Sequence, residues 1–227
     1  MTAFVYDDIE LIFIHTPKTG GTSVTDCLVG LDFVNQAAIQ AFNLTDHRKI
    51  EYIADGHITA TELRKRIGDE KYKKFFSFTI MREPYDWLLS LFAHGRSGLQ
   101  SLQDFENFID EFDNMSQKLQ SDWFTTDGAI DVDYVINFSH LENGLDKVVT
   151  HIEQSSSLYT SLNNVVPINV FISDLRKRFP PRKTNVTQHR MNIDAYRNNG
   201  VLNKATKLIQ KDLQLYEDLF GIRKEFI

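Results

Sequence analysis

A short apolar segment that runs directly into a glycine-containing loop is the feature that most constrains this chain. Leu11-Ile12-Phe13-Ile14 has the length and composition of a buried strand, and it stops at the loop His15-Thr16-Pro17-Lys18-Thr19-Gly20-Gly21. Thr22 and Ser23 come next, and hydroxyl residues are typical of a helix start. The sequence therefore predicts a strand, a tight turn and a helix in immediate succession.

The rest of the chain alternates strand and helix patterns. Further strands are predicted at 75–81 and 132–138, a turn at Asp127-Gly128, and helices at 59–67, 84–93, 101–120, 141–152 and 202–220. This alternation predicts an α/β fold with a parallel central sheet flanked by helices on both faces. The length of 227 residues suits a single domain over residues 1–227.

Charge and cysteine content narrow the function classes. The formal net charge is −6, so we expect no nucleic-acid partner, and local positive groups must hold any anionic ligand. The single cysteine, Cys27, cannot form a disulfide within the chain, and the segment 1–10 lacks the basic residues of a signal peptide. No apolar run is long enough for a membrane span. These features favour a cytoplasmic location.

The loop after the first strand has the features of a phosphate site. Its backbone N–H groups and the start of the next helix point at one place, and the glycines permit close approach. Lys18 adds a mobile positive charge and precedes the glycines, whereas the P-loop of nucleotide hydrolases has its lysine after them. The residues expected to contact phosphate are Lys18, Thr19, Gly20, Gly21, Thr22 and Ser23.

A second motif follows the strand predicted at 75–81. Arg82 ends that strand, Pro84 begins a helix, and Ser90 lies eight positions after the arginine. We expect Arg82 and Ser90 to meet one anion, because the planar guanidinium binds phosphate through two N–H groups. Trp87 in the same helix is predicted to be a core residue.

The two motifs, in this order, resemble those of the sulfotransferase superfamily, in the branch that includes carbohydrate O-sulfotransferases and many bacterial members. The resemblance implies a sulfotransferase fold related to the P-loop kinases. It also implies 3′-phosphoadenosine 5′-phosphosulfate as donor, no metal, and a lysine with a histidine or glutamate in the chemistry. The acceptor would be a hydroxyl or amine of a small molecule or carbohydrate. Neither the acceptor nor the oligomeric state can be inferred from the sequence.

Two side chains are assigned chemical roles. Lys18 is expected to neutralise charge on the leaving phosphate. His57 follows Gly56 between the motifs, where the resembling enzymes also place a Gly-His, and an imidazole can accept the acceptor proton near neutral pH. Glu62, His15 and His94 remain alternative bases, although the pattern Thr59-x-x-Glu62 already predicts a helix cap.

A basic stretch near the C-terminus is the third candidate region. Residues 176–190 are densely basic, and related enzymes place a late loop over the nucleotide, so Lys183, Asn185 and Thr187 are expected to contact it. A solvated basic loop would explain the same composition. Two other functions stay open: a nucleotide or small-molecule kinase that uses ATP with magnesium, and a nucleotide-binding protein without turnover.

Overall fold

A five-stranded mixed sheet forms the centre of the protein in the computed structural model, which describes residues 3–7, 9–25, 50–53, 57–94, 101–115, 117–155, 177 and 200–222. The strands are β1 (Ala3–Tyr6), β2 (Leu11–Ile14), β3 (Ile50–Ile53), β4 (Phe76–Met81) and β7 (Tyr134–Asn137), in the spatial order β3-β1-β2-β4-β7. β2, β4 and β7 pair in parallel, and β1 pairs antiparallel with both β2 and β3.

The predicted α/β fold is confirmed, with one difference in the sheet. The sequence predicted a wholly parallel sheet, whereas β1 runs opposite to the other four strands. Only residues 7–10 connect β1 to β2. A connection this short can form a hairpin but cannot carry a parallel crossover, which requires a dozen or more residues.

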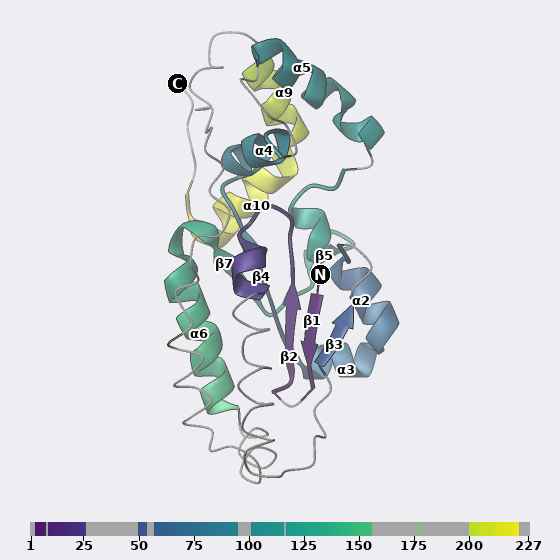
Figure 1. Ribbon diagram of the computed structural model, residues 1–227, viewed down its shortest axis with the longest axis vertical. Helices are drawn as coiled ribbons and strands as arrows, with labels where there is room; N and C mark the ends of the chain where they lie inside the picture. Colours follow the sequence, from purple (N-terminus) through teal and green to yellow (C-terminus); the bar gives the residue numbers. More distant parts are fainter. Residues whose placement is uncertain are drawn as a thin grey trace.

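Side chains that alternate along the strands build two apolar layers, one on each face of the sheet. The first layer contains Phe13 of β2 and Phe78 of β4, and it packs against α6 (Leu141–Gln154). The second contains Ile12 and Ile14, and it packs against α2 (Ala60–Ile67) and α3 (Asp69–Lys74). Figure 1 shows α6 on one side of the strands and α2 with α3 on the other.

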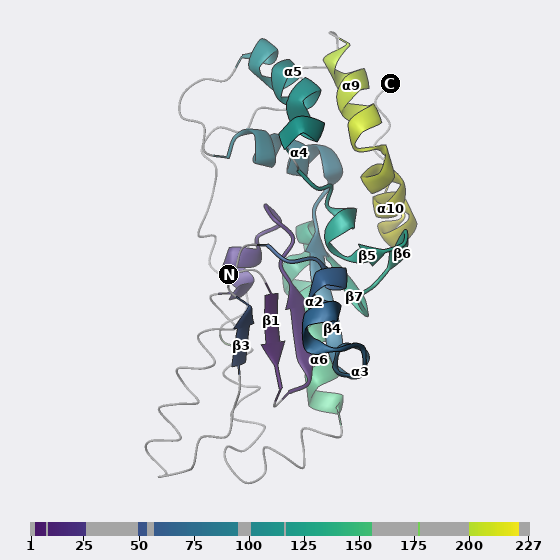
Figure 2. The same ribbon diagram turned by 90° about the vertical axis from the view of Figure 1, so that its right-hand side faces the viewer.

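A separate group of helices covers the end of the sheet at which β2 and β4 terminate. The group consists of α4 (Pro84–Phe92), α5 (Leu102–Glu111), α9 (Val201–Leu208) and α10 (Gln210–Phe220). The first three share an apolar cluster that includes Trp87, Phe92 and Phe105. Figures 1 and 2 both show this group beyond the upper end of the strands. The carboxyl ends of the parallel strands therefore lie beneath a helical layer.

Several predicted boundaries shift in the structure. The helix predicted at 101–120 ends at Glu111, and a 3₁₀ turn over Phe112–Met115 follows, because the weak helix formers Asp113 and Asn114 interrupt it. The predicted helix 202–220 is two helices that break at Ile209. The predicted turn at Asp127-Gly128 joins β5 (Thr125–Thr126) to β6 (Ala129–Ile130). Within the described residues, no helix has the length and apolar character needed to cross a membrane.

Candidate active site

The loop after β2 adopts a backbone that is unusual for one of its residues. Lys18 has a φ of 64°, in the left-handed region that only glycine enters freely, and Gly20 has a φ of 80°. The hydroxyl of Thr19 donates to the Thr16 carbonyl over 2.7 Å, so this side chain serves the loop itself. Residues 21–25 are helical, which leaves Thr22 exposed in the first turn. A non-glycine residue in this conformation is a feature that clusters at functional sites.

Two glycines in the loop are required by packing. A Cβ atom on Gly20 would lie 2.7 Å from Cε2 of Phe138, and one on Gly21 would overlap the imidazole of His15. The sequence suggested that these glycines allow the backbone to approach a phosphate. In the structure, the aromatic rings of Phe138 and His15 occupy the space that a side chain at Gly20 or Gly21 would need. Glycine is therefore required at both positions by packing alone.

Hydrogen bonds through the interior fix the loop to the second motif. The Trp87 indole N–H on α4 donates to the Pro17 carbonyl over 2.9 Å. The hydroxyls of Thr16 and Thr79 lie 3.0 Å apart, and Thr79 also donates to the carbonyl of Ile14 over 2.8 Å. Trp87 is 1% exposed, which agrees with its prediction as a core residue. The two motifs therefore form one unit.

The second motif begins where β4 ends. Glu83 caps α4 by accepting the backbone N–H groups of Tyr85 and Asp86, and Pro84 is the first helical residue, as predicted. The guanidinium of Arg82 lies over the Phe138 ring with 5.2 Å between Cζ and the ring centroid. Phe138 therefore lies against both motifs, since its ring also fills the space beside Gly20.

Lys18 and Arg82 bring positive charge from the two motifs to one place. Partial burial and, secondarily, the charge of Arg82 lower the pKa of Lys18. The Lys18 Nζ atom lies 3.1 Å from Nδ1 of His94, just beyond α4. Since an ammonium can only donate, His94 accepts through Nδ1, and the charge of Lys18 lowers the pKa of His94. Ser90 is half-buried in the second turn of α4, and His94 follows the end of that helix.

His57 lies next to the phosphate loop in a small aromatic group. Its Nδ1 atom is 3.2 Å from the His15 carbonyl oxygen, and its ring makes edge contacts with His15 at 5.0 Å and Trp123 at 5.4 Å between centroids. A carbonyl oxygen can only accept, so Nδ1 carries the proton and Nε2 of the neutral ring keeps its lone pair. Partial burial lowers the pKa of His57, although the bond to His15 acts in the opposite direction.

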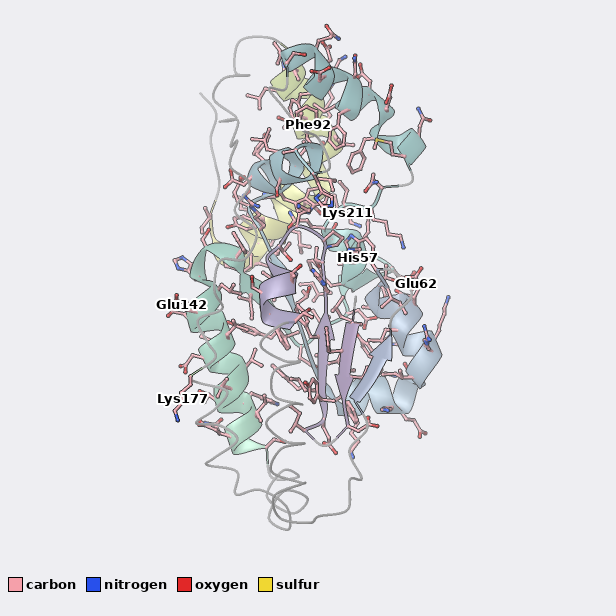
Figure 3. The ribbon with its side chains drawn as sticks, in the orientation of Figure 1. His57, Glu62, Phe92, Glu142, Lys177 and Lys211 are labelled. Carbon is pink, nitrogen blue, oxygen red and sulfur yellow. The ribbon has the colours of Figure 1, made fainter. Side chains whose placement is uncertain are left out.

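Two of the alternative bases, Glu62 and His15, make contacts that stabilise the fold. Glu62 completes the predicted capping box of α2: Oε2 accepts the backbone N–H of Thr59 over 2.8 Å, and Oε1 lies 3.5 Å from Lys118. The bond from the Thr59 backbone is the main cause that lowers the pKa of Glu62. His15 is 8% exposed, and its ring packs behind Gly21. Figure 3 shows His57 between the end of the sheet and the helical layer, with Glu62 farther out on α2.

Some expected site residues lie outside the described structure, and other contact residues were not anticipated. Lys183, Asn185 and Thr187 fall outside the described residues, and of the segment 176–190 only Lys177 is described. Phe138 and Gln120 contact Arg82, and Trp123 contacts His57, yet no local sequence pattern identifies these three residues. Among the residues that the structure describes, no group of three histidine, cysteine or acidic side chains is placed to hold a metal ion.

Comparison with known proteins identifies one family. The family model described as the sulfotransferase family matches residues 1–217. Searches of curated proteins and of solved structures return no match. The match spans both motifs, all five strands of the sheet and nearly all of the chain. The chain therefore belongs to the sulfotransferase family.

Proposed function

We propose that this sulfotransferase takes its sulfuryl group from 3′-phosphoadenosine 5′-phosphosulfate and transfers it to a hydroxyl or amine of a small-molecule or carbohydrate acceptor. Family membership establishes sulfuryl transfer in general. The observation that supports this donor is the approach of Lys18 and Arg82 at the carboxyl ends of β2 and β4, close enough for the charge of Arg82 to lower the pKa of Lys18. We include a cytoplasmic location in the proposal because the chain has a single cysteine.

The residues at this place suit a ligand with two separate anionic groups. Lys18 experiences the positive field of Arg82, in a protein whose net charge is −6. Each cation raises the electrostatic free energy of the other, so an anionic group bound beside each of them is favoured. The loop of Thr16–Gly21 with the exposed hydroxyl of Thr22 would hold the 5′-phosphosulfate, and Arg82 with Ser90 would hold the 3′-phosphate.

The roles of the side chains follow from their geometry. The donor supplies the sulfuryl group and a phosphate as its leaving group. Lys18 would neutralise negative charge on that phosphate, which requires its Nζ atom to turn from His94 toward the ligand. His57 would accept the acceptor proton at Nε2, because Nδ1 is held by the His15 carbonyl. The lowered pKa of His57 keeps the ring neutral, and therefore basic, at neutral pH.

Calorimetric titration tests the donor. The protein should bind 3′-phosphoadenosine 5′-phosphate more tightly than ATP with magnesium, and Arg82→Ala should remove most of that preference. Arg66→Ala is the matched control, since Arg66 is exposed on α2. Tighter binding of magnesium-ATP by the wild-type protein would reject the proposed donor and favour a kinase. Binding of the bisphosphate without any sulfuryl transfer across a panel of acceptors would favour a binding protein.

A further inference from the structure

Arg82 is the first residue of the chain after β4, just beyond the last pair that β4 forms with β7. The pairing of β4 with β7 ends at Met81 opposite Asn137, so the peptide of Arg82 lies just beyond the ladder. The side chain of Gln120 makes the hydrogen bonds to Arg82 that a strand partner would otherwise make. Its Oε1 atom accepts the backbone N–H of Arg82 over 2.9 Å, and its Nε2 atom donates to the Arg82 carbonyl over 3.0 Å. One side-chain amide therefore makes both hydrogen bonds that a neighbouring strand would make.

Gln120 is itself held by a carboxylate from α10. Asp212 Oδ2 accepts the backbone N–H of Gln120 over 2.8 Å, and Oδ1 accepts that of Ser121 over 2.9 Å. Gln120, Ser121 and Asp212 are each 0% exposed. Because each carboxylate oxygen takes a separate peptide N–H, the segment at Gln120 has one orientation relative to α10. The contacts join residues that are far apart in the sequence and meet at Arg82.

We propose that Gln120 and Asp212 are positioning residues for Arg82 and direct its guanidinium toward the 3′-phosphate of the donor. This inference rests on the proposed function. The backbone angles of Arg82 decide where its Cβ atom points, and Gln120 fixes the peptide groups on which those angles depend. The Phe138 ring then limits the far end of the side chain, with 5.2 Å between Cζ and the ring centroid. Arg82 is thus held at its backbone and at its guanidinium.

Two nucleotides separate a positioning role from a general structural one. Binding of 3′-phosphoadenosine 5′-phosphate and of adenosine 5′-monophosphate is measured by calorimetry for the wild-type protein, Gln120→Met and Asp212→Asn. Methionine keeps the length of glutamine without its hydrogen bonds, and asparagine replaces one accepting oxygen by an amide group that cannot accept. Asp218→Asn is the matched control, because Asp218 is exposed on the same helix.

We expect both variants to bind the bisphosphate about 10- to 100-fold more weakly, because a misplaced arginine loses its aligned contacts. Binding of the monophosphate, and both affinities of Asp218→Asn, should stay unchanged. Equal weakening for both nucleotides, an unchanged preference for the bisphosphate, or unfolding of both variants in circular dichroism would each overturn the positioning role. If Asp212→Asn alone unfolds, Gln120→Met decides. A wild-type protein without preference for the bisphosphate would overturn the proposed donor site together with this inference.

Discussion

Replacing Trp87 by phenylalanine tests whether the two motifs are fixed to each other through the interior. The indole N–H of Trp87 donates to the Pro17 carbonyl over 2.9 Å from a side chain that is 1% exposed. Loss of a buried hydrogen-bond donor costs about 1–3 kcal/mol. The smaller ring leaves space that costs on the order of 1 kcal/mol more. The free energy of unfolding should fall by about 2–4 kcal/mol, which lowers Tm by roughly 4–16 °C for a chain of this size.

Thermal unfolding followed by circular dichroism measures this loss, and calorimetry with 3′-phosphoadenosine 5′-phosphate measures its effect on the site. We expect affinity for the bisphosphate to fall about tenfold, because Pro17 precedes Lys18 and the loop loses its anchor. Trp123→Phe is the matched control, since the Trp123 indole nitrogen has no hydrogen-bond partner in the described structure. Equal Tm losses in the two variants would refute the assignment of the cost to the Pro17 hydrogen bond.

Three further predictions concern the chemistry. Lys18→Ala should lower kcat by about 10²–10³-fold, whereas Lys65→Ala, an exposed lysine on α2, should leave it unchanged; a Lys18 variant with the wild-type rate would contradict its role. His57→Ala should lower kcat by about 10²–10⁴-fold. Only the neutral ring accepts a proton, and desolvation lowers the pKa of His57, so the wild-type rate should decline on acidification with a midpoint below that of an unperturbed imidazole; a midpoint above that of an unperturbed imidazole would argue against this base. Glu62→Ala should lower the free energy of unfolding by no more than about 1 kcal/mol, because it removes one half of the capping box while Thr59 still caps α2, and it should leave kcat nearly unchanged; a hundredfold fall in kcat would transfer the role of base to Glu62.

The parts of the fold that could be predicted depend on local patterns. The strand Leu11–Ile14, the capping box that opens α2 and the proline at the start of α4 each lie within one short segment, and each has the predicted place in the structure. The strands β1 and β3 were not predicted, because neither is followed by a glycine-containing loop like the one after Leu11–Ile14, and because β3 pairs with β1, a segment far away in the sequence. The helix α3 was not predicted either, because only Tyr72 is buried in this polar helix and no apolar periodicity appears.

The site, like the fold, has features that general rules predict and contacts that only the tertiary structure reveals. That Lys18 and Arg82 lie near each other follows from the rule that parallel strands end at one edge of the sheet. Their action on the donor stays a prediction, as do the roles of His57 and Ser90. The contacts of Gln120 could not be predicted, because they join segments 38 and 92 residues apart and depend on how the helical layer packs.

The charge of the protein and the charge of the site have opposite signs, and this contrast bears on the ligand. A chain with 31 acidic and 25 basic residues repels long polyanions, while Lys18 and Arg82 present two cations close together. Interior hydrogen bonds hold the Arg82 backbone and the loop that carries Lys18 in place despite the repulsion between their charges. A compact ligand with two anionic groups removes that repulsion without an extended basic groove. We therefore expect a small, doubly phosphorylated nucleotide to bind, and we expect a long sulfated polysaccharide to be a poor acceptor.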